Sequence, residues 1–77
     1  MDYGRIASDI LTNVGGKENV KSVTHCFTRL RFVLKDESKA KKDVVEHLEG
    51  VISVVVAGGQ FQVVCGAKVT KIYDAVL

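Results

Sequence analysis

The sequence predicts an α+β fold: an open sandwich in which a four-stranded antiparallel sheet, made of two hairpins, carries three helices mainly on one face. Apolar residues recur at helical spacing near both ends of the chain, and two pairs of β-prone segments lie between them, each pair joined by a tight connection. The predicted order is therefore helix, strand, strand, helix, strand, strand, helix. With 77 residues the chain has room for one domain, residues 1–77.

The first part of the chain predicts a helix followed by a hairpin. Residues 2–14 carry an apolar stripe at helical spacing, with Asp2 as the expected N-cap and a glycine pair as the stop. A strand over 20–25 follows, and a second strand runs from about 28 to 34. Two sets of side chains alternate along the second strand and face opposite ways: Leu30, Phe32 and Leu34 against Arg29, Arg31 and Val33.

A middle helix is expected from Ser38 through Glu49, with Ser38 as its cap. Its buried side would carry three apolar residues: Val44, Val45 and Leu48.

The second hairpin pairs residues 51–57 with residues 60–65 across the turn Gly58-Gly59, where positive φ is required. Its return strand also alternates: Phe61, Val63 and Cys65 against Gln60, Gln62 and Val64. After Gly66, a last helix has its apolar residues at i, i+3, i+4 and i+7: Val69, Ile72, Tyr73 and Val76.

Composition excludes several classes of protein. The net charge of +2 is well short of a nucleic-acid-binding footprint, and the longest apolar run is far below the ~20 residues of a membrane-spanning helix. Two cysteines are too few for a disulfide framework, and the N-terminus shows no secretory signal, so we expect free thiols in a reducing cytoplasm. No metal-ligand spacing is present, and no metal is expected.

The segment from His25 to Arg31 predicts chemistry. Cys26 lies where the first strand gives way to the second, and a thiol in an exposed turn is unusual because thiols favour burial. Arg29 and Arg31 occupy alternate positions of one strand, so their side chains share a face and can converge on one anion. Thr28 adds a hydroxyl donor, and backbone N–H groups at the turn can point inward as well.

Such a cluster suits a cysteine that carries a phosphoryl group. The group has a charge of about −1.5 to −2, which guanidinium forks bind in bidentate fashion. The same positive field lowers the pKa of a thiol from its free value of about 8.5. The segment therefore predicts phosphoryl transfer with Cys26 as nucleophile. A tyrosine-phosphatase loop is excluded, because its arginine would fall at Phe32.

Other interpretations stay open from the residues alone. Cys26 is also compatible with a structural thiol or a redox sensor, and the domain with a non-enzymatic RNA- or protein-binding module. Against RNA binding, Phe32 and Phe61 alternate onto the apolar face, away from the arginines. The side chain of His25 is expected to point to the opposite face from that of Cys26. This favours a role in shaping the turn or in contacting a partner. Cys65 is expected in the core.

The sequence resembles the cytoplasmic B domain (EIIB) of the enzyme II sugar permeases of the bacterial phosphoenolpyruvate-dependent phosphotransferase system (PTS), glucose/β-glucoside type. The signature Cys-x-Thr-Arg-Leu-Arg-Phe of that family is present as residues 26–32. The resemblance extends along the whole chain, including Gly15-Gly16-Lys17-Glu18-Asn19 and the segment from Ala57 to Val64, and is greatest to the β-glucoside and sucrose/trehalose branch.

The resemblance implies a phosphotransferase. Cys26 would accept a phosphoryl group from a phosphohistidine of the EIIA domain and pass it to a sugar held by the EIIC membrane domain, at the cytoplasmic face of the membrane. Phe27, Thr28, Arg29 and Arg31 would surround the phosphate. No cofactor and no nucleic acid are implied. The chain would be either a domain excised from a longer permease, which we favour, or a stand-alone B subunit.

Two positions depart from the pattern of the family. Phe27 occupies a position that is usually small, where a ring would either crowd a docking partner or add an apolar contact to it. Cys65 stands where an aliphatic residue is common, a change that is expected to be neutral.

Overall fold

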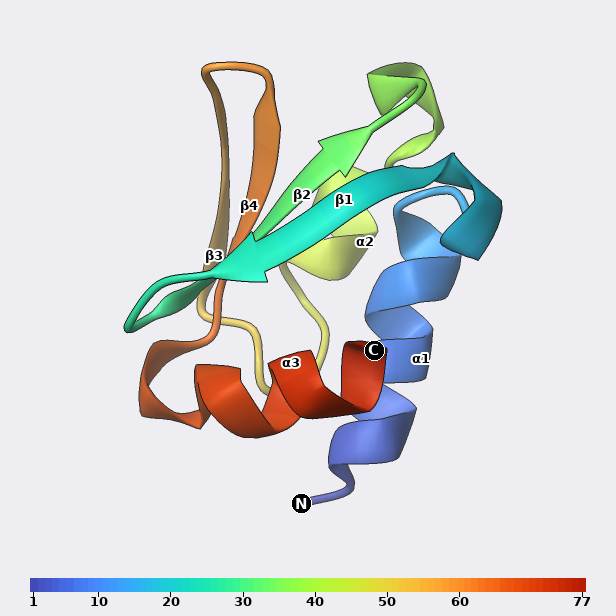
Figure 1. Ribbon diagram of the computed structural model, residues 1–77. Coiled ribbons are helices and arrows are strands. Elements are labelled where there is room, and N and C mark those ends of the chain that lie inside the picture. The colour runs from blue at the N-terminus through green and yellow to red at the C-terminus, as the bar shows by residue number, and fades with distance from the viewer.

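A computed structural model describes the whole chain, residues 1–77. Its elements follow the predicted order, and short 3₁₀ turns precede β1, α2 and α3 (Figure 1). The bounds are α1 Tyr3–Asn13, β1 Val20–His25, β2 Arg29–Leu34, α2 Lys42–Val45, β3 Ser53–Ala57, β4 Gln60–Val64 and α3 Val69–Val76. None of these helices has the length and apolar character needed to span a bilayer.

The four strands form one antiparallel sheet in the order β1-β2-β4-β3. Each predicted hairpin is therefore confirmed, and the two hairpins join through β2 and β4. Gly58 and Gly59 make the second turn with φ of 59° and 76°, as expected. The pairing of the central strands sets Arg29 opposite Val64 and Arg31 opposite Gln62, a register that determines the site.

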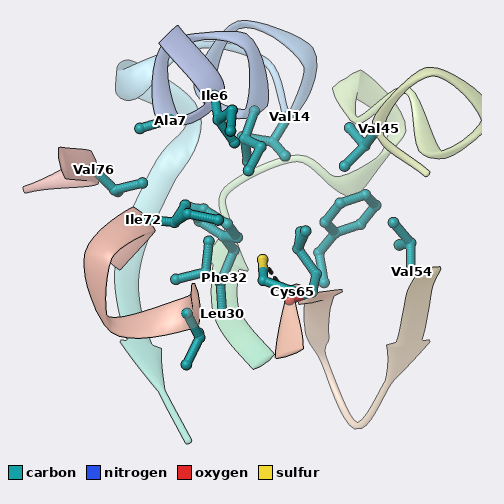
Figure 2. Close-up of a cluster of buried hydrophobic side chains, with 14 of the residues drawn as sticks. Ile6, Ala7, Val14, Leu30, Phe32, Val45, Val54, Cys65, Ile72 and Val76 are labelled. Atoms are coloured by element: carbon teal, nitrogen blue, oxygen red, sulfur yellow. Dashed lines mark hydrogen bonds between the residues drawn. The ribbon is translucent and has the colours of Figure 1, made fainter. Parts of the chain in front are cut away.

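The core lies between the sheet and the helices, which are on one side of it (Figure 1). Side chains from α1, α3 and the inner face of the sheet converge there (Figure 2). Leu30, Phe32 and Leu34 are all buried, as their alternation predicted, and Cys65 is a core thiol. Burial of these apolar groups is the main force that fixes the position of the hairpins against the helices.

The predicted middle helix is mostly wrong. Asp36, not Ser38, is the cap: its carboxylate accepts a hydrogen bond from the N–H of Ser38 and begins only a 3₁₀ turn. Ala40 is extended, with ψ of 130°, which interrupts the helix before α2 begins at Lys42. The competing bond is from Lys41 N to Asn13 O, 2.7 Å, which ties the segment to the end of α1.

The prediction was also partly wrong about the buried side of this segment. Val45 is fully buried and Leu48 packs against the core, but Val44 is 43% exposed. Because α2 has only four residues, it presents one side chain to the core rather than a stripe.

Candidate functional site

The loop at the tip of the β1–β2 hairpin carries the cysteine, and backbone hydrogen bonds fix it at both sides. The N–H of Cys26 donates to the carbonyl of Arg29, 3.0 Å, which closes the loop. The carbonyl of Thr28 accepts from the N–H groups of Cys65 and Gly66, at 2.8 and 3.0 Å, which anchors the loop to the end of β4. Cys26 therefore sits on a restrained turn, half-buried, instead of a free loop.

The environment of Cys26 favours its thiolate. The pKa of this thiol is lowered from 9.0 to about 7, chiefly by the backbone N–H of Thr28, with further contributions from the N–H of Arg29 and from the Arg31 guanidinium. Partial loss of water acts in the opposite direction. Thr28 thus acts on the sulfur through its backbone, whereas the sequence prediction relied on its hydroxyl.

The two arginines differ in what they offer the sulfur. The side chain of Arg31 lowers the pKa of the thiol by hydrogen bonding and by its charge. Arg29 acts on it through the backbone N–H, while its guanidinium donates from Nη1 to Oε1 of Gln62, 2.9 Å. Only the guanidinium of Arg31 lowers the pKa of Cys26, whereas that of Arg29 is directed to Gln62; convergence of both groups on one anion stays a prediction.

Two glutamines of β4 complete the arrangement. Gln60 Oε1 accepts from Nη1 of Arg31 and from Nε2 of Gln62, both at 3.2 Å. The four side chains form a continuous hydrogen-bonded series, here called the amide–guanidinium chain: Arg29, Gln62, Gln60 and Arg31. The single ion pair of the molecule is Arg5–Asp9, so neither Arg29 nor Arg31 has a carboxylate partner.

Sequence reasoning named both glutamines as alternating polar residues but gave them no role. The signal was present, because Gln60 and Gln62 alternate on one strand as the arginines do on another. What was missing was the strand order, since only the adjacency of β2 and β4 brings the two pairs together.

On the other side of the loop, Phe27 projects into solvent and is 95% exposed. It borders a hollow of about 530 Å³, whose lining residues are His25, Cys26, Phe27, Ala67, Val69 and Thr70. An exposed aromatic ring beside a mainly apolar hollow is typical of a surface that another molecule covers.

His25 lies against α3. Its ring is 4.4 Å from the ring of Tyr73, centroid to centroid, and its Nδ1 is 3.0 Å from the carbonyl oxygen of Cys26. These contacts place the ring between the cysteine loop and α3, and its role in shaping the turn or in contacting a partner stays a prediction.

Cys65 is buried, and burial raises its pKa to about 11. A thiol that stays protonated is a poor resolving partner, which weakens the redox interpretation of Cys26. The structure contains no cluster of three or more His, Cys, Asp or Glu side chains able to hold a metal ion.

The sheet and the cysteine loop define a small α+β domain that carries a thiol of lowered pKa at a hairpin tip. The family model described as "phosphotransferase system, EIIB" matches residues 8–40. A solved structure, one domain of the PTS system IIabc component from Clostridium difficile, is 36% identical with a TM-score of 0.91, over 96% of this chain and 78% of that one. The chain belongs to the EIIB family of the phosphotransferase system.

Curated relatives place it within that family. The PTS system beta-glucoside-specific EIIBCA component of Halalkalibacterium halodurans is 53% identical over 100% of this chain, which matches 12% of that protein. The sucrose-specific EIIBC component of Bacillus subtilis is 46% identical over 97% of this chain and 16% of that protein. The chain thus spans about an eighth to a sixth of the length of these relatives.

Proposed function

We propose that this domain is a phosphoryl carrier of the phosphoenolpyruvate-dependent sugar phosphotransferase system. Cys26 accepts a phosphoryl group from a phosphohistidine of an EIIA domain and passes it to a sugar bound by an EIIC membrane domain. The observation that carries the proposal is the acidified thiol beside an arginine that no carboxylate neutralises. The fused EIIB, EIIC and EIIA names of the relatives support the choice of partners.

Each transfer is a displacement at phosphorus. In the first, the Cys26 thiolate attacks, an S–P bond forms, the P–N bond to the donor imidazole breaks, and the imidazole keeps the electron pair. In the second, a sugar hydroxyl oxygen attacks, the S–P bond breaks, and the thiolate leaves while the hydroxyl proton passes to solvent or a base of the acceptor. Positioning and charge stabilisation carry most of the catalysis in such steps.

The phosphoryl group adds negative charge where the thiolate was. The backbone N–H groups of Thr28 and Arg29 and the guanidinium of Arg31 lower the pKa of the Cys26 thiol, so they favour negative charge at the sulfur. Phosphate oxygens would accept hydrogen bonds from these donors. Arg29 is only three residues from Cys26 in sequence, and its guanidinium would also bind the phosphate if it gave up its bond to Gln62. The same groups that acidify the thiol would thus hold the product of its attack.

The sugar is proposed to be of the β-glucoside or sucrose/trehalose class, on the strength of the relatives. Within the permease, the choice of sugar would belong to the membrane domain. We further propose that the domain works as one part of such a longer permease, at the cytoplasmic face of the bacterial membrane.

The alternative of an RNA-binding sheet has no structural support. Phe32 and Phe61 are both buried in the core, so the sheet offers no aromatic ring beside the arginines on which a base could stack.

The test is to incubate the domain with a phosphorylated EIIA domain of a β-glucoside relative and locate the label by mass spectrometry. We expect one phosphoryl group, on the peptide that contains Cys26. Cys65→Ala, the matched cysteine variant, should accept label as the unmodified domain does. Label that persists in Cys26→Ser at the same rate would contradict the assignment of the nucleophile.

A further inference from the structure

We propose that Gln60 and Gln62 are positioning residues of this site: their neutral amides orient the guanidinium groups beside the cysteine loop without cancelling positive charge. The proposal deepens the proposed phosphoryl transfer and rests on it for its biological meaning. Its test uses the unphosphorylated domain, so the two ideas can fail separately.

The geometry gives the amide–guanidinium chain a fixed direction. Gln62 uses both ends of its amide: Oε1 accepts from Arg29 at 2.9 Å, and Nε2 donates to Gln60 at 3.2 Å. The donated bond leaves Gln60 with its Oε1 facing the guanidinium of Arg31, 3.2 Å away. The amide of Gln62 is bound at both ends and cannot rotate without losing a bond. Gln60 accepts both of its bonds on Oε1, so turning its amide over would lose both, and each glutamine therefore restrains the next group in the series.

The side chains that accept hydrogen bonds from Arg29 and Arg31 are uncharged amides. Charged side chains that lose part of their water are usually paired with an opposite charge. Here the two guanidinium groups have amide oxygens as partners, and the molecule's single ion pair is elsewhere, between Arg5 and Asp9. An amide satisfies one N–H of a guanidinium and leaves its charge available to a thiolate or a phosphoryl group. A carboxylate at the same position would compete with that anion.

Burial indicates that the arrangement is more than a surface contact. Gln62 is 8% exposed on a central strand, where an apolar side chain would avoid the cost of removing an amide from water. The side-chain hydrogen bonds of both glutamines go only to each other and to the two arginines. The amides therefore serve the arginines, and through Arg31 they act on the thiol of Cys26.

The experiment measures the pKa of Cys26 from its rate of alkylation by iodoacetamide against pH, read on the tryptic peptide that contains it. Gln60→Glu keeps an acceptor for Arg31 and adds one negative charge. We expect the pKa to rise by about half a unit or more, which slows alkylation roughly threefold below the pKa. The control is Ala57→Glu, which adds the same charge at the exposed residue paired with Gln60 on β3; it should shift the pKa by less than half as much.

A double-mutant cycle separates positioning from a direct charge effect. In an Arg31→Ala background, Gln60→Glu should no longer raise the pKa of Cys26, because its action passes through the guanidinium. An unchanged pKa in the single variant, or an equal rise with and without Arg31, would overturn the proposal. If Gln60→Glu does not fold by near-ultraviolet circular dichroism, Gln60→Met enters the same cycle with the same expected directions. Failure of Cys26 to accept phosphate would remove the proposed function but leave this cycle interpretable.

Discussion

The carbonyl of Thr28 accepts a hydrogen bond from the N–H of Cys65 at 2.8 Å, and this contact joins the cysteine loop to the end of the central strand β4. Gly66 adds a second bond to the same carbonyl, at 3.0 Å. The N–H of Thr28 is in turn the main cause of the lowered pKa of Cys26. The residue whose N–H most lowers the pKa of the thiol is therefore held in place by contacts between two hairpins that are far apart in the sequence.

Gly66→Ala should disturb this anchor. Gly66 has φ of +74°, and a Cβ there would lie 3.2 Å from Cδ1 of Ile52. We expect a loss of about 1–2 kcal/mol in the free energy of unfolding, measured with urea, together with a higher pKa of Cys26. The control is Gly58→Ala, where φ is +59° but a Cβ would meet no atom within 4 Å. It should lose similar stability and leave the pKa of Cys26 unchanged; equal effects on the pKa would disprove the anchoring role.

The pH dependence of stability should show both thiols, with opposite signs. Cys26 has a pKa of about 7 when folded against 9.0 when unfolded, so the folded state loses its proton first. The free energy of unfolding therefore gains a contribution as pH rises from about 7 to 9, and loses it as pH falls through 7. For Cys65 the folded pKa is raised from 9.0 to about 11, so its contribution is lost as pH rises through that interval.

The measurement compares urea unfolding of the domain with that of Cys26→Ser and Cys65→Ala across this pH range. The difference between the domain and Cys26→Ser should increase up to about pH 9. A difference that is flat with pH would mean that the thiol of Cys26 is not acidified by folding.

Substitution of Arg31 and of Arg29 by lysine should affect the pKa of Cys26 differently. Arg31→Lys keeps a charge but loses the planar fork, and we expect a higher pKa of Cys26 together with slower transfer to sugar. Arg29→Lys should leave the pKa nearly unchanged, because Arg29 acts on the sulfur through its backbone N–H. Both variants should fold, since both side chains are only half-buried and alternate along β2 with the core residues Leu30, Phe32 and Leu34.

Rates of phosphate acceptance and of transfer to sugar, measured separately, test this division. Transfer should fall more than acceptance in both variants. A large rise of the Cys26 pKa in Arg29→Lys would show that its guanidinium acts on the sulfur directly.

Phe27→Ala should leave the domain as stable as before, within about 0.5 kcal/mol, because the ring is 95% exposed. If the ring contacts the donor, the KM for phosphorylated EIIA rises several-fold while kcat changes little. The control is Val56→Ala, an exposed apolar residue near the β3–β4 turn, at the other end of the sheet from the cysteine loop. An unchanged KM for the donor in Phe27→Ala would exclude the contact.

The sequence by itself was enough for the element order, the two hairpins and the alternation of buried and open faces, and it supplied the proposal that Cys26 is the functional residue. These features depend on local periodicity and on residues that lie close together along the chain, such as Thr28 and Arg31. It was misleading for the middle helix, because the bond from Lys41 to Asn13 and the extended Ala40 are consequences of packing, not of local propensity.

Only the tertiary structure decided the strand order, and with it the residues that surround the arginines. Pairing β2 with β4 brings Gln60 and Gln62 beside Arg31 and Arg29 across about thirty residues of chain. A strand pattern shows which side chains share a face but not which strand lies next to it, since that choice depends on how the whole core closes. For this reason the proposed nucleophile could be identified from its neighbours in sequence, whereas the glutamines that bond to Arg29 and Arg31 could not.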